Sequence, residues 1–267
     1  MFRSLRFKII VFLIIANGLS FVTMNIINYE ISNKRMNAQL EKQSMVDLNN
    51  TVANLNTMLS LRLHEAEVLT DSEVIRNGAP QVKLNWLKYN IAKSNVRYAY
   101  FGIADRTGSL TLADGRTQQI GHFSAYRQAL LGISSISDPV LDEGGKPIVW
   151  LFVPLFDQGN PEWRITEVAA LAVDSFGLFH PILSVKTDDY EDSGITLVDR
   201  DMNMLHNSSS PDLILKRNYV RDEPSIYPYA EKMRTTEQGN GDVYLFGRVL
   251  KLFYVKVPGH DWYAVFT

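Results

Sequence analysis

The N-terminal part of the chain carries one continuous apolar stretch bounded by charge. No charged residue occurs between Lys8 and Glu30, and the apolar run that begins at Ile9 continues to Ile27. About 20 helical residues cross the hydrocarbon layer of a bilayer. The pattern therefore predicts a membrane-spanning helix over residues 9–27, after a short N-terminus of residues 1–8.

Beyond that stretch the sequence predicts a long helix. Neither Gly nor Pro occurs between Leu19 and Ile75, and the stop signal Asn77-Gly78-Ala79-Pro80 follows. We expect one helix from the membrane to about residue 75. Its apolar positions alternate in steps of three and four, with Arg62 at the one seam position that is not apolar, and this is a heptad-like stripe. The stripe consists of Met45, Leu48, Val52, Leu55, Leu59, Ala66 and Leu69.

Two interpretations of this stripe stay open. It could pack on its own domain, or it could form a seam between two copies of the chain. The two are compatible, because different parts of a long helix can do each. We expect a homodimer through the long helix.

After Pro80 the pattern changes to a second helix over 80–94 and then to short strands. Residues 98–104 and 109–113 predict two strands, and Asp105-Arg-Thr-Gly108 between them has turn chemistry. The same pattern recurs later in the chain. There the predicted strand is 194–198, the turn begins at Asp199-Arg200-Asp201, and 202–205 is the returning strand.

Each half also ends in further strands. These are predicted over 147–154 and 166–173, and over 241–246, 250–257 and 262–267, with Asp142-Glu-Gly-Gly145 and Gln238-Gly-Asn-Gly241 as turns. We interpret the pattern as an internal duplication over about 95–185 and 190–267. Because hairpin turns rather than helical crossovers join the strands, the fold class is α+β.

Charge orients the chain and narrows its partners. Arg3, Arg6 and Lys8 precede the predicted span, so the positive-inside rule keeps this flank cytoplasmic and exports the rest. A cleaved signal peptide is the alternative, with Ala16-Asn17-Gly18 as its candidate cleavage site. The balance of 27 basic against 29 acidic residues argues against a nucleic-acid partner.

Catalytic and metal chemistry find little support in the sequence. The chain has no Cys, which excludes disulfides and thiolate sites. Its five His residues are scattered without metal-ligand spacing, and neither a nucleophile elbow nor a phosphate loop occurs. We therefore expect no enzyme activity, no metal and no cofactor in this chain.

Several segments, specific in their order rather than singly, resemble a known sensor family. They are Tyr100-Phe-Gly-Ile-Ala-Asp-Arg-Thr-Gly108, Phe123-Ser-Ala-Tyr-Arg-Gln-Ala-Leu-Leu-Gly132, Ile136-Ser-Asp-Pro-Val140, Leu171-Ala-Val-Asp174, Thr196-Leu-Val-Asp-Arg200 and Pro258-Gly-His-Asp-Trp-Tyr263. Together with the N-terminal anchor they resemble the double Cache (dCache) domain, the two-module extracellular sensor of bacterial chemoreceptors, histidine kinases and cyclic-di-nucleotide enzymes. The resemblance covers essentially the whole chain.

The resemblance implies two PAS-like antiparallel-sheet modules in tandem after a long extracytoplasmic helix over 28–76. The membrane-distal module, over 77–187, would bind a small molecule, and the membrane-proximal module would cover 188–267. The chain would then be the sensor region of a receptor in the bacterial inner membrane, with its bulk periplasmic or extracellular. The rival interpretation is an exported binding or interaction protein with a single anchor, and sequence beyond Thr267 would separate the two.

The resemblance also implies a ligand pocket around the helix expected at 123–132. Family members that bind amino acids have an Arg, a Trp and a Tyr on that helix and an Asp on a late strand. Tyr126 matches the Tyr and Asp174 matches the Asp, but Phe123 stands at the Arg position and Ala125 at the Trp position. The bidentate guanidinium that usually binds a carboxylate is therefore missing from the helix.

What remains is a carboxylate among aromatic rings. The candidate ligand-binding residues are Asp174, Tyr126, Phe123, Tyr100, Tyr98 and Trp150. This set suits a cationic or amine-bearing ligand, while an amino acid held by other residues, another small metabolite or no ligand at all stay open. Each candidate has a structural alternative. Asp174 could cap a helix beginning at Phe176, the aromatic side chains could be core, and the period of two places Tyr98 and Tyr100 on one strand face.

Overall fold

The computed structural model describes residues 5–94, 96–156, 165–184, 194–245 and 247–267. Residues 1–4 of the predicted N-terminal segment, and the predicted module boundary at 187–188, lie outside these ranges. The chain forms two compact units, Met1–Asp47 and Leu48–Thr267. Helix α1 (Leu5–Thr70) contributes residues to both units.

In the first unit, α1 carries an exposed apolar surface. Its described large apolar side chains between Ile9 and Ile27 are 50% to 72% exposed, and the helix is long and apolar enough to cross a membrane. Asn17, Thr23 and Asn25 in this stretch bond to the helix's own backbone, which lowers the cost of placing them in a bilayer. These bonds run from Asn17 to the Leu13 carbonyl, from Thr23 to Leu19 and from Asn25 to Phe21.

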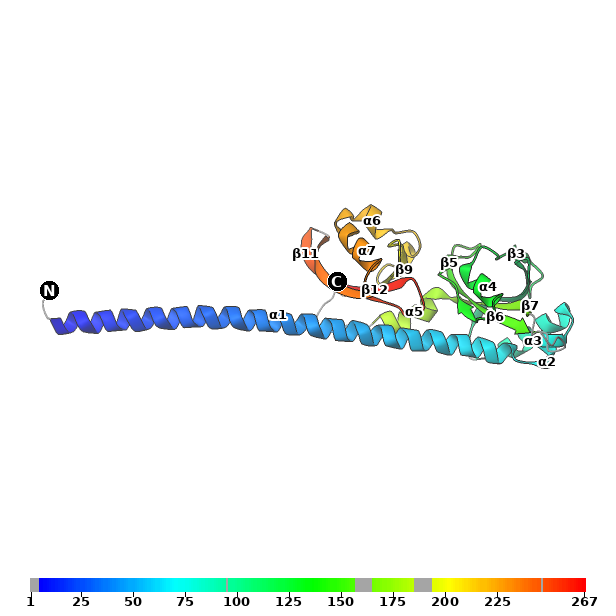
Figure 1. Ribbon diagram of the computed structural model, residues 1–267, viewed down its shortest axis with the longest axis horizontal. Coiled ribbons are helices and arrows are strands. Elements are labelled where there is room, and N and C mark those ends of the chain that lie inside the picture. Colours follow the sequence, from blue (N-terminus) through cyan, green and yellow to red (C-terminus); the bar gives the residue numbers. More distant parts are fainter. Residues whose placement is uncertain (1–4, 95, 157–164, 185–193, 246) are drawn as a thin grey trace. The chain divides into compact units, whose positions relative to one another are not determined.

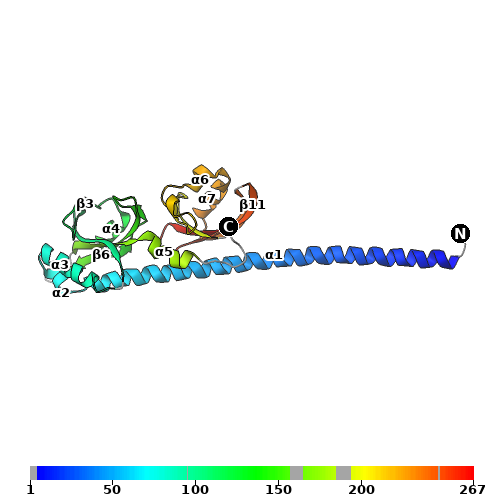
Figure 2. The same cartoon turned by 180° about the vertical axis from the view of Figure 1, so that it is seen from behind.

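In the second unit, the remaining part of α1 runs alongside both sheets (Figures 1 and 2). Its apolar stripe is buried there. Leu48, Leu55, Leu59 and Ala66 are at most 1% exposed, and Val52 is 4% exposed. The interpretation that the stripe packs on its own domain is therefore confirmed at these positions. A seam with a second copy would have to use another face of the helix, and dimerisation stays a prediction.

The long helix ends earlier than expected, at Thr70 rather than near residue 75. Ser72 starts a new helix, α2 (Glu73–Asn77), because its hydroxyl accepts a hydrogen bond from the Ile75 amide at 3.2 Å. Helix α3 (Pro80–Ile91) follows, with a proline at its first turn, where no amide partner is needed.

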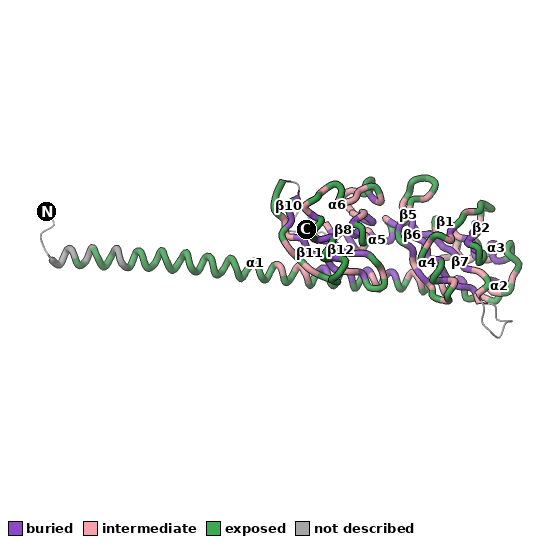
Figure 3. Tube along the Cα trace, turned by 45° about the horizontal axis from the view of Figure 1, so that its top comes forward, coloured by how far each residue is buried: buried purple, intermediate pink, exposed green. Residues whose placement is uncertain are grey.

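The distal module is built on one antiparallel sheet. Its strands are β1 (Tyr98–Asp105), β2 (Ser109–Leu112), β3 (Thr117–Gln119), β4 (Ser135–Ile136), β5 (Val140–Leu141), β6 (Pro147–Phe156) and β7 (Ile165–Asp174), in the order β3-β2-β1-β7-β6-β4, with β5 also paired to β6. Helix α4 (Ser124–Ala129) covers one face. The middle of β6 is buried at eight consecutive positions (Figure 3), which means that both faces of the sheet are covered.

A bulge in β1 overturns the expectation that Tyr98 and Tyr100 share a strand face. Tyr98 pairs with Val173 and Tyr100 pairs with Ala172, so two residues of β1 span a single step of β7. Successive residues of a strand point to opposite faces, and the extra residue, Ala99, shifts the alternation. Tyr100 therefore lies on the α4 face with the buried core there, whereas Tyr98 lies on the opposite face, near Arg62 and Glu65 of α1.

The proximal module has a second antiparallel sheet. Its strands are β8 (Ile195–Asp199), β9 (Met204–His206), β10 (Gln238–Leu245), β11 (Arg248–Lys256) and β12 (Trp262–Phe266), in the order β10-β11-β12-β8-β9. Helix α5 (Ser175–Leu183) connects the modules, and α6 (Tyr219–Asp222), α7 (Tyr227–Met233) and the short helices η1 (Pro211–Leu213) and η2 (Pro224–Ile226) complete the second one. A long helix followed by two antiparallel sheets confirms the predicted α+β class.

The predicted turn at Gln238-Gly-Asn-Gly241 is wrong, because these residues begin strand β10. The glycines serve close packing instead. A Cβ atom at Gly239 would lie 2.5 Å from the Tyr254 hydroxyl, and one at Gly241 would lie 2.6 Å from the Tyr229 hydroxyl. Two tyrosines thus lie flat against the strand where any larger residue would clash.

The repeated Asp-Arg turns are confirmed as turns in both modules. Asp105 accepts hydrogen bonds from the amides of Thr107 and Ser109, at 2.9 and 3.1 Å. Asp199 accepts from the amides two and four residues on, at 2.9 and 2.8 Å. The same carboxylate geometry therefore closes the first hairpin of each sheet.

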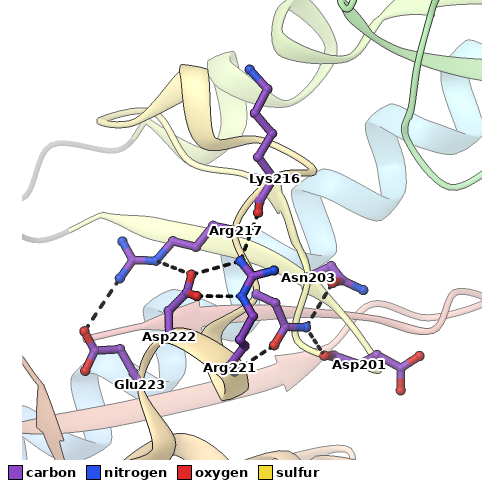
Figure 4. A network of polar contacts seen from close by, with 8 residues as sticks. Asp201, Asn203, Lys216, Arg217, Arg221, Asp222 and Glu223 are labelled. Carbon is purple, nitrogen blue, oxygen red and sulfur yellow. Dashed lines mark hydrogen bonds and ion pairs between the residues drawn. The ribbon is translucent and has the colours of Figure 1, made fainter.

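A polar network fixes the segment between β9 and α6 (Figure 4). Asn218 caps α6 and also donates to the Asp201 carbonyl at 2.8 Å. Arg221 bonds to Asp222 at 2.8 Å, and Arg217 lies within 4 Å of Asp222 and Glu223. The charges at this surface bind one another, so the network explains the loop's conformation.

A hydrogen bond between side chains links strand β12 of the proximal module to the distal module. The Trp262 indole of β12 donates to the Asp138 carboxylate, which lies between β4 and β5 of the distal module, at 2.5 Å. Trp262 is fully buried, and Phe179 of α5 meets its ring edge-on at 5.7 Å. The core of the proximal module is thereby tied to the distal module.

We expect this bond to couple the stabilities of the two modules. Asp138→Ala and Trp262→Phe each remove it, and Asp138→Ala/Trp262→Phe removes the same bond only once. Because a hydrogen bond to a charged group contributes about 1.5–3 kcal/mol, urea unfolding of the four proteins should give an interaction energy of roughly 1–2 kcal/mol. Strictly additive losses would show that the contact contributes nothing.

A buried histidine lies next to this junction. His206 of β9 is fully buried, and its Nδ1 atom has no hydrogen-bond partner among the residues that the structure describes. Its Nε2 atom lies 3.3 Å from the Ser208 hydroxyl, which also lies 3.2 Å from Nδ1 of His180. Burial, and then the neighbouring His180, lowers the pKa of His206 to about 4.

The depressed pKa predicts acid-sensitive folding. The unfolded chain takes up a proton at His206 below about pH 6.5, while the folded protein does so only near pH 4. The contribution of His206 to the free energy of unfolding should therefore be constant above pH 6.5 and decrease by up to about 3 kcal/mol towards pH 4. Urea unfolding at several pH values should show this loss reduced in His206→Gln and retained in His64→Gln, whose side chain is exposed on α1. Equal pH profiles for the wild type and His206→Gln would contradict it.

Candidate ligand-binding cavity

A cavity of about 230 Å³ opens on the α4 face of the distal sheet. Its walls come from strands β1, β5 and β6, from the hairpin of β2 and β3, and from the start of α4. Pockets for drug-sized ligands measure roughly 300–1,000 Å³, so this one fits a smaller molecule. The lining residues are Tyr100, Leu112, Arg116, Gln118, Gln119, Ile120, His122, Phe123, Val140, Leu141, Asp142, Glu143, Ile148 and Trp150.

Two aromatic rings and an alanine explain why the sheet is hollow here. Tyr100 of β1 and Trp150 of β6 both pair with Ala172 of β7, which lies between them. The two rings stack with their centroids 6.4 Å apart and their planes at 27°. The methyl group of Ala172 leaves space that a larger side chain on the central strand would fill.

Phe123 closes the cavity at the start of α4. It occupies the N-cap position of that helix but offers no side-chain oxygen to the helix amides. Its ring packs against Phe152 at 6.0 Å and against His122 at 4.1 Å. This wall is therefore aromatic rather than charged, as expected from the missing guanidinium on the helix.

The carboxylate of the cavity is Asp142, in the hairpin between β5 and β6. One of its oxygens accepts the amides of Gly144 and Lys146, each at 2.8 Å, and the other accepts the Tyr100 hydroxyl at 2.9 Å. Partial burial acts to raise the pKa of Asp142, but the Lys146 amide, the Tyr100 hydroxyl and the Gly144 amide outweigh it and hold the pKa below the usual value. Asp142 is thus a fixed negative charge beside an aromatic floor.

A guanidinium lies at the mouth of the cavity. Arg116 follows the turn between β2 and β3 and binds Asp114 at 2.8 Å and Glu143, from the opposite hairpin, at 2.6 Å. Its guanidinium carbon lies 5.4 Å from the centroid of the Tyr100 ring. Three carboxylates, those of Asp114, Asp142 and Glu143, therefore surround one cation and one electron-rich ring.

The structure brings three of the six predicted site residues together. Tyr100, Phe123 and Trp150 line the cavity. Trp150 is only 2% exposed, so it is a core residue whose ring also reaches the cavity wall.

The other three predicted residues lie elsewhere. Tyr126 is buried in the core beneath α4, where its hydroxyl donates to the Asp105 carbonyl. Tyr98 lies on the opposite sheet face, and Asp174 accepts the Gly177 amide at 2.5 Å as the N-cap of α5. The capping alternative for Asp174 is confirmed, and a ligand contact for these three residues stays a prediction.

Asp142, Glu143 and Arg116 were not among the site residues predicted from the sequence. Asp142 and Glu143 belong to the turn Asp142-Glu-Gly-Gly145, and that interpretation as a turn is correct. Arg116 stands in a separate hairpin, 26 positions earlier in the chain. The two hairpins belong to one sheet, and only this shared sheet places the side chains of Arg116, Asp142 and Glu143 at the same cavity.

Comparisons with known proteins identify the fold. No protein-family model matches the sequence, and no curated protein sequence matches it. Solved structures do match. The ligand-binding domain of the Pseudomonas aeruginosa amino acid chemoreceptor PctC, in complex with GABA, is 20% identical, with a TM-score of 0.64 over 85% of this chain and 98% of that one.

Two further structures agree. The P. aeruginosa chemoreceptor PctB with L-Arg is 17% identical, covers 85% of this chain and 94% of that one, and has a TM-score of 0.63. The Pseudomonas fluorescens chemoreceptor CtaA with L-serine is also 17% identical, covers 85% and 96%, and has a TM-score of 0.61. All three are ligand-binding domains rather than catalytic ones. The chain therefore has the fold of the dCache-type sensor domains of bacterial receptors.

Proposed function

We propose that this chain is the extracytoplasmic sensor region of a bacterial membrane receptor, and that the distal cavity binds a small amine-bearing metabolite. The proposal depends above all on the cavity, in which the fixed carboxylate of Asp142 faces the rings of Tyr100 and Trp150. The similar structures with bound amino acids support a sensory role for the fold.

The balance of charge favours a cation as the ligand group. The positive charges of Arg116 and of Lys146, which acts on Asp142, are outnumbered by the carboxylates of Asp114, Asp142 and Glu143, which leaves an excess of one negative charge at the mouth. Aromatic faces attract cations through their quadrupole, by about 0.5–1 kcal/mol at exposed sites. An ammonium group against Tyr100 would gain from both, while an anion would meet repulsion.

The connection between modules suggests how binding reaches the rest of the receptor. The segment from Asp138 to Asp142 contacts the ligand cavity at one end and Trp262 of the proximal module at the other. A ligand that moves Asp142 would also move this segment and so the contact with Trp262. Binding changes the equilibrium between two arrangements of the modules only if the ligand has different affinities for them.

The remaining assignments complete this proposal. Residues 9–27 would anchor the chain in the inner membrane, and residues 28–76 would carry the two modules outside the cytoplasm. A second copy would associate along α1 on a face other than the buried stripe, where Leu61 and Val68 are 52% and 61% exposed and seven residues apart.

A ligand screen on the full chain in lipid nanodiscs tests the sensor assignment. Amine-bearing metabolites should raise the melting temperature, because a ligand at about 100 times its Kd stabilises the folded state by about 2.7 kcal/mol. Asp142→Asn should weaken a confirmed hit at least tenfold, measured by isothermal titration calorimetry, because it removes a charged partner.

Two variants serve as comparisons for that measurement. Asp212→Asn changes an exposed carboxylate of the proximal module and should leave the Kd unchanged. Asp174→Asn tests the contact predicted from the sequence, and a loss there equal to that of Asp142→Asn would move the site towards α5. If only anions or uncharged metabolites bind, the proposed ligand class is wrong.

A further inference from the structure

The side chain of Arg116 already occupies the position that a cationic ligand would need. Its guanidinium is held by Asp114 and Glu143 and lies over the Tyr100 ring. The same ring donates its hydroxyl to Asp142 and stacks beside Trp150. An aromatic face next to carboxylates is the arrangement that binds an external ammonium or guanidinium group.

The backbone of Arg116 is held in a defined conformation, while its side chain can still move. Arg116 donates its amide to the Asp114 carboxylate at 3.0 Å, and its carbonyl accepts the Leu112 amide at 2.9 Å. The turn between β2 and β3 needs Gly115 at a φ of +88°. The guanidinium therefore enters from a short, well-defined hairpin rather than from a loose loop.

We propose that Arg116 is an internal competitor, whose guanidinium must leave the Tyr100 face before the cation of a ligand can bind there. This inference rests on the proposed function, because it assumes that the cavity takes an amine. It adds a specificity-determining residue. Arg116 lowers the affinity for simple monocations, so that only ligands with further contacts to the cavity displace it efficiently.

The contacts of Arg116 are of the kind that a ligand can displace. The side chains of Arg116 and Asp114 are 45% and 49% exposed, and that of Glu143 is 75% exposed. Exposed ion pairs contribute little because water and salt screen them. Only molecules in which Arg116 has left the Tyr100 ring can bind the ligand's cation there. The apparent affinity for the ligand is therefore the intrinsic affinity multiplied by the fraction of molecules in that open state.

Displacement would also change the protein. Glu143 lies next to Asp142, so release of Arg116 removes the ion pair that joins the two hairpins over the cavity. The hairpin of β5 and β6 would then be free to follow the ligand. Ligand binding and hairpin movement are thus linked through one side chain.

The test uses n-butylamine, a monocation without a carboxylate, on the full chain in nanodiscs. Arg116→Gln keeps a polar side chain but removes the competing charge. We expect its Kd for n-butylamine to be at least fivefold lower than that of the wild type. Arg127→Gln removes an exposed arginine of α4 that does not line the cavity, and it should match the wild type.

A second readout follows the guanidinium itself. In the wild type labelled with 15N-arginine, saturating n-butylamine should shift the Nε–H resonance that is lost in Arg116→Gln, and should leave that of Arg127 in place. An unmoved Arg116 resonance together with measurable binding would overturn the inference.

The outcomes separate this inference from the proposed function. If n-butylamine or an amine from the screen binds the wild type and Arg116→Gln equally well, or binds Arg116→Gln more weakly, Arg116 is not a competitor while the amine-sensing cavity stands. If no amine binds either protein, and both remain folded by their unfolding transitions, the inference and the proposed ligand class fail together.

Discussion

The ladder between β6 and β7 is the interaction on which the distal module depends. Both strands are ten residues long and pair along almost their whole length. Burial on both faces forces nearly every position to be apolar, as in Pro147–Phe156. Ala172 of β7 leaves the hollow between Tyr100 and Trp150 because its side chain is small. The same pair of strands thus supplies stability and the floor of the cavity.

Charged groups gather where this ladder meets its hairpins. Asp142 keeps its negative charge because backbone amides and the Tyr100 hydroxyl bind it, and these outweigh its partial burial. In the proximal module burial wins instead, and raises the pKa of Asp199 although its turn has the same hydrogen bonds. A carboxylate that accepts the amides two and four residues on therefore has a lowered pKa in one turn and a raised pKa in another. The Asp142 turn lies at the mouth of the cavity, whereas Asp199 is more deeply buried.

Most of the fold could be predicted from the sequence, and the errors have identifiable causes. The long helix, the hairpins and the repeated Asp turn follow from local periodicity and turn chemistry, which act over a few residues. The helix end was misplaced because Ser72 caps a new helix. Gly239 and Gly241 indicated a turn, but they accommodate Tyr254 and Tyr229, which are distant in sequence. Glycine has several uses, and local pattern cannot choose among them.

For the site, the sequence by its resemblance to a sensor family indicated an aromatic pocket in the distal module and an arginine missing from its helix, but the carboxylate that it named, Asp174, caps α5 instead. It named Tyr100, Phe123 and Trp150, which line the cavity. Only the tertiary structure decided that the carboxylate there is Asp142 and that Arg116 supplies a guanidinium from another hairpin. The reason is physical: a one-residue bulge reverses which face a side chain takes, and strand pairing brings together hairpins that no local pattern connects.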